Sequence, residues 1–222
     1  MDLDEDTSHH IVQVLRMKEG EKIAITDGKG NVASGMIATA HKKHATIHII
    51  SFETTPAITP KLSIAISLVK NSSRFEWFLE KCTELGVTEI LPLLCDRTER
   101  QKFRHDRMLG ICRSAMLQSL QTWLPVLHAP VSFNDVVRGA KEQQKMIAHC
   151  VREAKVDFSS LYNPSLDSHI ILIGPEGDFS ESEIAFARAN NFIPVSLGST
   201  RLRTETAGVF AAAWARGARE EE

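Results

Sequence analysis

The chain has 222 residues, of which 43% are hydrophobic and 24% are charged, and its formal net charge is −2. This length allows one large domain, or a small domain joined to a medium one. The sequence contains no run of about 18 apolar residues, so we expect no membrane span. Its acidic first six residues differ from the basic start of a signal peptide, so a cytoplasmic protein is expected. The near-neutral charge also argues against a general nucleic-acid coat.

Cysteine and histidine spacing gives no sign of a metal site. The four cysteines lie far apart and form no Cys-x-x-Cys pair, which argues against a zinc site and against a disulfide framework. Five of the nine histidines fall in the first 50 residues without a companion set of carboxylates. We therefore expect reduced cysteines, surface histidines and no bound metal.

Residues 1–55 are typical of a small β domain. A short helix is expected over residues 8–16, where apolar side chains share one helical face. Alternating patterns predict strands over residues 22–26, 32–38 and 45–50. We expect these strands to form a small antiparallel barrel. The barrel ends at a linker over residues 54–60, because its two prolines cannot continue a strand ladder.

Residues 61–222 alternate between strands and helices. The predicted strands are residues 61–69, 89–94, 146–150, 169–173 and 193–197. The predicted helices are residues 73–85, 104–120, 133–143, 181–190 and 207–218. Ser180 and Glu183 form a capping box that fixes the start of the fourth helix. The alternation predicts a mostly parallel sheet with helices on both faces.

Two glycine loops follow strands of this predicted sheet. Residues 174–177 read Gly-Pro-Glu-Gly after one strand, and Gly198 follows another. Neither loop matches a phosphate loop or a dinucleotide fingerprint. Ligands bind at the carboxyl ends of strands in open α/β sheets, so the loops predict a backbone wall against a flat ligand. A tight structural turn is the alternative interpretation of the first loop.

Charged residues lie beside the second loop and in the middle of the chain. Arg203 and Glu205 lie just before the last predicted helix. They are either a capping ion pair, or Arg203 neutralises charge that develops on a substrate. Six of the ten basic residues in positions 61–130 fall between Arg97 and Arg113. This cluster is either a solvated helix face or a patch that contacts phosphates.

Six motifs, in chain order, resemble one family. They are residues 14–18 with Gly20, residues 27–30, residues 81–87, Pro92 with Arg97, Gln118-Ser119 with Pro125, and the glycine loops with residues 202–207. Together they span nearly the whole chain and resemble the RsmE family of ribosomal RNA methyltransferases, in the SPOUT superfamily. The resemblance implies a PUA-like RNA-binding domain over residues 1–55. It also implies a trefoil-knotted methyltransferase domain over residues 61–222.

The family's activity is methyl transfer from S-adenosylmethionine to N3 of a uridine in 16S rRNA of the small ribosomal subunit, by a homodimer. The resemblance implies that the cofactor is held by His149, Ile173, Gly174, Pro175, Glu176, Gly177, Leu197, Gly198, Leu202, Arg203 and Thr204. Arg203 is expected to stabilise an anionic uracil, and Glu205 to act as general base or to orient Arg203. RNA phosphates are expected to contact Arg16, Lys70, Arg74 and Arg97.

The sequence departs from the family pattern at three places. The family usually has further residues before Leu3, which would supply an edge strand of the first domain. Asp178 replaces a glycine after the first loop and adds a negative charge near the donor. An arginine usual near Gln121 is absent, so we expect the Arg97–Arg113 cluster to take over its RNA contact. The alternative functions are a related methyltransferase acting on another RNA, such as tRNA, and a non-catalytic RNA-binding or ribosome-assembly protein.

Overall fold

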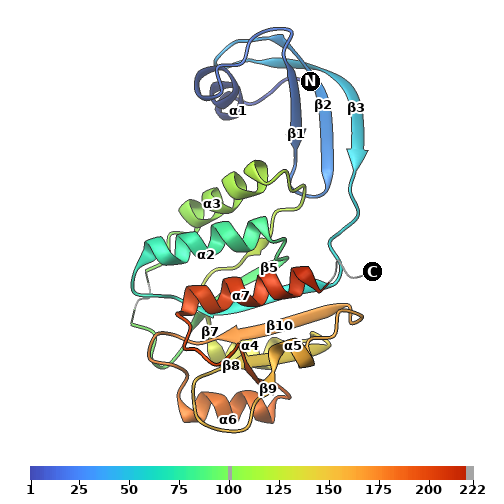
Figure 1. Ribbon diagram of the computed structural model, residues 1–222. Helices are drawn as coiled ribbons and strands as arrows, with labels where there is room; N and C mark the ends of the chain where they lie inside the picture. The colour runs from blue at the N-terminus through green and yellow to red at the C-terminus, as the bar shows by residue number, and fades with distance from the viewer. Residues whose placement is uncertain (100–101, 219–222) are drawn as a thin grey trace. The chain divides into compact units, whose positions relative to one another are not determined.

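The computed structural model describes residues 1–99 and 102–218, and the chain divides into two compact units. The first unit comprises residues 1–57 and the second begins at Ile58 (Figure 1). The boundary lies inside the proline-containing segment that the sequence indicates as a linker. Each unit has its own buried apolar residues.

The first unit packs a short helical segment against an antiparallel sheet. Helix α1 (Glu5–His9) continues as a π-helical turn η1 (His10–Val14). The strands β1 (Lys22–Thr26), β2 (Asn31–Thr39) and β3 (Thr46–Thr54) pair in the order β1-β2-β3. Ile11 of the helical segment is buried together with Ile37 and Ile47 of the sheet, which gives this unit its core.

Two expectations for this unit are wrong in detail. The helical segment begins at Glu5, three residues earlier than expected, because the Asp4 carboxylate accepts a hydrogen bond from the Thr7 amide at 2.8 Å and caps it. Among the described residues the three strands form an open sheet, residues 1–3 pair with the outer side of β3 through the Asp2–Thr46 bridge, and no pairing closes the sheet into a barrel.

The second unit is built on a parallel sheet, as predicted. Its main strands are β4 (Lys61–Ser67), β5 (Glu89–Leu94), β8 (Gln144–Ala148), β10 (Ser168–Ile173) and β11 (Ile193–Ser196). Short strands β6 (Val126–Leu127), β7 (Val131–Ser132) and β9 (Val156–Asp157) complete it in the order β6-β5-β4-β10-β8-β11-β9, with β7 beside β5. Two-residue strands carry no period, so the sequence does not reveal these short ones.

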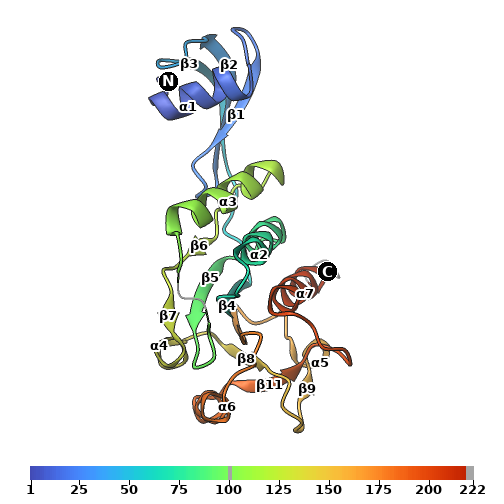
Figure 2. The same ribbon diagram turned by 90° about the vertical axis from the view of Figure 1, so that its left-hand side faces the viewer.

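Helices cover both faces of this sheet (Figures 1 and 2). On one face lie α2 (Ser72–Glu84), α3 (His105–Gln118), α5 (Phe158–Leu161) and α7 (Thr204–Gly217); on the other lie α4 (Phe133–Gly139) and α6 (Glu181–Ala189). Because side chains alternate along a strand, Ile171 and Ile173 enter the first core while Ile170 and Leu172 enter the second.

The ends of several elements differ from the predicted ranges. Helix α4 ends at Gly139, four residues before the expected end, and β8 begins at Gln144 and stops at Ala148. Residues 149 and 150, which were predicted to end this strand, therefore belong to the loop after it. The capping box of α6 is confirmed, because Ser180 Oγ accepts from the Glu183 amide and the Glu183 carboxylate accepts from the Ser180 amide.

Helix α7 packs its small residues inward. Ala207, Ala211, Ala212 and Ala215 are all buried in the core shared with α2. A Cβ atom added at Gly208 would lie 2.4 Å from the Phe78 ring, so only glycine allows α7 to approach α2 this closely. The small-residue face therefore serves packing within the chain, and the face with Phe210 and Trp214 is exposed.

Candidate functional site

A cavity of about 670 Å³ lies at the carboxyl ends of three neighbouring strands. β8 pairs in parallel with β10 on one side and with β11 on the other, so the loops that follow these strands emerge together. The loop after β10, the loop after β8, and the segment from β11 to α7 line the cavity. Its volume falls in the range of about 300–1,000 Å³ usual for small-molecule sites.

The first wall is the loop from Gly174 to Asp178, which leaves β10 and turns back sharply. The Asp178 amide donates to the Pro175 carbonyl at 2.9 Å and closes the turn. A Cβ atom at Gly174 would lie 3.1–3.2 Å from Phe179, so glycine permits the close return of the chain. The buried Thr204 hydroxyl donates to the Gly174 carbonyl at 2.9 Å and links the wall to the start of α7.

This wall is also fastened to the loops that follow β4 and β5. The Lys70 amide donates to Glu176 Oε1 at 3.0 Å, and Arg97 Nη1 donates to the Gly177 carbonyl at 2.8 Å. Farther along, one oxygen of Glu183 accepts from the Asp96 amide at 2.9 Å, and the other accepts from the Ser180 amide at 2.8 Å. The loop is therefore held in one conformation from several sides.

The second wall comes from the segment between β11 and α7. Gly198 has a φ of 117°, a conformation that favours glycine, and no atom lies within 4 Å of the position of an added Cβ. Leu197 and Leu202 contribute apolar surface beside this open backbone. The segment can therefore bring main-chain polar groups and aliphatic side chains against a flat ligand.

The third wall is the loop after β8, where His149 is buried. Its Nε2 lies 3.1 Å from Glu153 Oε1, and the side chain has no exposed surface. Burial lowers the pKa of His149 below its ordinary value of 6.5, and the positive charge of Lys155 lowers it further. The imidazole is therefore held neutral near pH 7, even though the carboxylates of Glu153 and Asp178 oppose this shift.

Asp178 joins the first wall to the third. Its Oδ2 accepts a hydrogen bond from the Cys150 amide at 2.8 Å, and its Oδ1 accepts from the Phe179 amide at 2.9 Å. The residue has a φ of 63°, which L-residues rarely adopt and which Asp tolerates better than most. The carboxylate for which the sequence gives no reason is thus a brace across two loops of the cavity.

Comparisons with known proteins show the family to which this chain belongs. A family model described as an RNA methyltransferase domain matches residues 57–216, and one described as an RNA methyltransferase PUA domain matches residues 3–50. The ribosomal RNA small subunit methyltransferase E of Synechocystis is 32% identical over 211 residues, covering 92% of this chain and 69% of that protein. The chain belongs to the ribosomal RNA small subunit methyltransferase E family.

Solved structures agree with this assignment. A crystal structure of the family member from Neisseria gonorrhoeae, bound to S-adenosylmethionine, has a TM-score of 0.86 at 29% identity and covers 96% of this chain and 89% of its own. A chain from Porphyromonas gingivalis reaches a TM-score of 0.88 at 36% identity, covering 96% of this chain and 91% of its own. The predicted family and the predicted combination of a parallel sheet with a PUA domain are thereby confirmed.

The cavity brings together ten of the eleven residues expected at the methyltransferase cofactor. They are His149, Ile173, Gly174, Pro175, Glu176, Leu197, Gly198, Leu202, Arg203 and Thr204. The remaining one, Gly177, does not line the cavity and instead contacts Arg97. The structure adds residues that were not among the expected cofactor contacts, including Arg152 and Lys155, and it confirms that Asp178 lies at the cavity. The position of β8 between β10 and β11 explains this, because strand order is not visible in the sequence.

The two residues expected to act in catalysis occupy different environments. Arg203 lines the cavity immediately before α7 and is exposed, and its side chain has no hydrogen bond or ion pair with the part of the chain that the structure describes. Glu205 is buried, does not line the cavity, and forms an ion pair with Arg74, whose Nε lies 3.6 Å from Glu205 Oε1. The ion pair of Glu205 is therefore with Arg74, so the alternative interpretation of Arg203 and Glu205 as a capping ion pair is wrong.

Three of the four basic residues expected to contact RNA make ion pairs or hydrogen bonds within the protein. Lys70 Nζ lies 2.9 Å from Glu99 Oε2, Arg74 pairs with Glu205, and Arg97 donates to the first wall. Arg16 is exposed in the first unit.

In the Arg97–Arg113 cluster, Arg107 makes two hydrogen bonds with Glu76, at 2.8 and 3.0 Å. Arg104 and Arg113 are exposed. Arg100 of this cluster lies outside the described residues. An RNA contact by the cluster stays a prediction.

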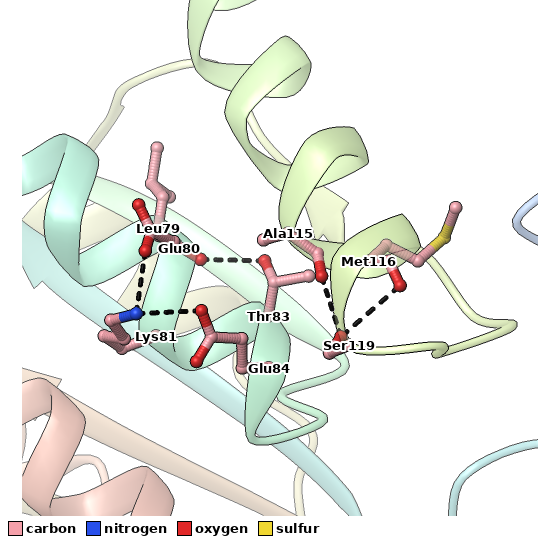
Figure 3. A network of polar contacts seen from close by, with 8 residues as sticks. All are labelled: Leu79, Glu80, Lys81, Thr83, Glu84, Ala115, Met116 and Ser119. Atoms are coloured by element: carbon pink, nitrogen blue, oxygen red, sulfur yellow. Dashed lines mark hydrogen bonds and ion pairs between the residues drawn. The ribbon is translucent and has the colours of Figure 1, made fainter. Parts of the chain in front are cut away.

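Family motifs away from the cavity make contacts within α2 and at the end of α3 (Figure 3). Lys81 Nζ lies between Glu80 and Glu84, at 2.7 and 2.9 Å. The Ser119 hydroxyl donates to the Ala115 carbonyl at 2.7 Å at the end of α3. None of these residues lines the cavity, and each of these contacts stays within one helix or its end.

Two further observations bear on the class of site. Across residues 1–99 and 102–218, no cluster of three or more metal-ligating side chains occurs. Over the same residues, no helix has the length and apolar character needed to cross a membrane.

Proposed function

We propose that this protein methylates N3 of a uridine in 16S rRNA of the small ribosomal subunit, with S-adenosylmethionine as the methyl donor. The observation that carries the proposal is the cavity: three loops at adjacent strand ends, fastened to one another, in a chain of the small subunit methyltransferase E family. Small subunits are assembled in the cytoplasm of bacteria, so the proposal places the protein there.

The residues of the cavity suit an adenosine with an amino-acid tail. Ile173, Val195 and Leu197 supply apolar surface for a flat base, and the open backbone at Gly198 permits close approach. Exposed charged side chains at the same cavity, such as Arg152 and Glu176, suit the carboxylate and ammonium groups of the tail. The donor, once bound, supplies a methyl group already activated on a sulfonium sulfur, so the protein's task is to bind, orient and stabilise charge.

Arg203 is our choice for the group that acts on the uracil. Methylation at N3 requires that this nitrogen lose its proton, which in this proposal passes to water at the exposed side of the cavity and leaves negative charge on the ring. The guanidinium of Arg203 lines the cavity and is not used by another side chain among the described residues, so it can stabilise that charge. Glu205 has a different role in this proposal: its carboxylate holds Arg74, and with it the start of α2, against the start of α7.

The two units divide the work in this proposal. The PUA domain binds RNA, with Arg16 on a phosphate, and the second domain carries the trefoil knot and the chemistry. Lys70 and Arg97, from loops near the cavity, and Arg74, from the first turn of α2, contribute phosphate contacts. These contacts position the RNA and carry no base specificity.

We also propose that the protein is a homodimer through the outer face of α7. Phe210 and Trp214 are 39% and 43% exposed and stack with ring centroids 6.4 Å apart, one helical turn from each other. Trp77 on the adjacent helix α2 is 42% exposed. Exposed aromatic residues on packed helices are typical of protein interfaces. Light scattering should show a dimer in the wild type and a monomer in the Phe210→Glu, Trp214→Glu double variant.

One experiment tests the activity. The protein is incubated with labelled S-adenosylmethionine and small ribosomal subunits that lack the modification, and the labelled nucleotide is mapped. Label at N3 of one uridine in 16S rRNA is the expected result. Label only in another RNA, such as tRNA, would show a related methyltransferase of different substrate. Donor binding without label transfer to any RNA would show a non-catalytic RNA-binding protein.

A further inference from the structure

The cavity contains one half-buried carboxylate whose charge is not balanced by an ion pair. Asp178 lines the cavity and accepts hydrogen bonds from two main-chain amides, those of Cys150 and Phe179. Amide donors fix the orientation of the carboxylate but leave its net negative charge in place. No ion pair to Asp178 occurs among residues 1–99 and 102–218.

The arginines and the other carboxylate at the cavity are exposed, whereas Lys155 is half-buried and keeps its positive charge although its ammonium donates to two carbonyls. Arg152, Arg201 and Arg203 are exposed, and Lys155 Nζ donates to the carbonyls of His149 and Val151 at 2.7 and 3.0 Å. Glu176 is exposed. Charges in water are screened more strongly than those that are partly buried. Asp178 is therefore the carboxylate whose field acts most directly inside the cavity.

The side chain of Asp178 makes contacts that a glycine at this position could not make. Its φ of 63° would be adopted more readily by glycine. Its Oδ2 connects the loop after β10 with the loop after β8 through the Cys150 amide, and its Oδ1 accepts from the Phe179 amide within its own loop.

We propose that Asp178 determines the preference of the cavity for the methyl donor over the demethylated product. This inference rests on the proposed use of S-adenosylmethionine. Donor and product share the adenosine and the amino-acid tail, and they differ by one methyl group and by the positive charge of the sulfonium. Groups that bind the shared parts cannot distinguish the two. A carboxylate facing the cavity attracts the cationic donor and not the neutral thioether, so it favours exchange of product for donor.

The test measures dissociation constants by calorimetry, without RNA and without turnover. The ligands are S-adenosylmethionine, S-adenosylhomocysteine and sinefungin, which carries a cationic amine in place of the methylated sulfonium. The variants are Asp178→Asn and Asp178→Gly. Asp167→Asn is the matched control, because Asp167 precedes β10 at the opposite end of that strand. Asp178→Gly suits the observed φ and so keeps the test valid if the Asn variant folds poorly.

We expect the preference for donor over product to fall about tenfold in both Asp178 variants, with sinefungin weakening as the donor does. The Asp167→Asn control should keep the wild-type preference. If all three ligands weaken by the same factor in both variants, Asp178 is only a brace and the proposal is overturned. If the wild type binds the donor and both Asp178 variants keep its preference for donor over product, the proposal is overturned while the proposed function stands.

Discussion

Replacing Gly208 by alanine has two opposite effects on stability: it raises the helix propensity of α7 and it overpacks the contact between α7 and α2. Alanine is favoured over glycine by about 0.8–1.0 kcal/mol inside a helix. The added Cβ would, however, lie 2.4 and 2.8 Å from two carbons of the Phe78 ring and 3.1 Å from Ile66. Ordinary carbon contacts are about 3.5–4.0 Å, so α7 must move away or the ring must leave its rotamer. Overpacking of this kind costs about 1–3 kcal/mol, and the shortness of these contacts places it at or above the upper end.

The expected net effect is a loss of about 2 kcal/mol, which lowers the melting temperature by about 4–8 °C in a unit of this size. Gly110, inside α3, is the matched control because no atom lies within 4 Å of an added Cβ there. Gly110→Ala should therefore raise the melting temperature by about 2–4 °C. Thermal unfolding followed by circular dichroism measures both. A Gly208→Ala protein as stable as the wild type would refute the inference that α7 is seated by this contact.

Three further predictions concern the cavity. Thr204→Val keeps the shape of the side chain but removes the hydroxyl that donates to the Gly174 carbonyl at 2.9 Å. We expect the free energy of unfolding, measured with denaturant, to fall by about 1–3 kcal/mol and the binding of S-adenosylmethionine to weaken. Unchanged values for both would contradict the role of this link. Arg203→Met should reduce single-turnover methyl transfer about 100-fold with an unchanged melting temperature, and equal losses in donor affinity and rate would show a binding role instead. Because burial lowers the pKa of His149 below 6.5, the unfolded chain binds its proton first as pH falls. Stability should therefore drop as pH decreases below about 6.5, and His149→Gln should flatten this dependence if the imidazole causes it.

Local patterns predicted most of the elements, because their causes are local. The capping box at Ser180 and Glu183 depends on residues three apart, and it set the start of α6 correctly. Apolar runs predicted the five main strands of the parallel sheet, and the glycine loops after two of them predicted a ligand site at the strand ends, where the cavity lies. The ten cofactor residues that line the cavity were implied by the family resemblance. The end of α4 was wrong by four residues, because propensity alone does not show where a short helix stops.

The contacts that join distant segments could not be predicted from the residues alone. Asp178 is bonded to the amide of Cys150, 28 positions away, and this pairing depends on β8 lying beside β10. Likewise Glu205 pairs with Arg74 across α2 and α7, where the sequence suggested its neighbour Arg203. Strand order and helix packing determine such partners, and neither can be predicted from the local spacing of residues.

The two oxygens of the Glu183 carboxylate couple the start of α6 to the loop after β5, so that these two segments should unfold locally together. One oxygen accepts from the Ser180 amide within the helix cap, and the other accepts from the Asp96 amide, 87 positions away. The first turn of α6 cannot fray without also releasing the loop that carries Arg97 to the cavity wall. In hydrogen exchange, the amides of Asp96 and Ser180 should therefore exchange through one common event, and Glu183→Ala should accelerate both together.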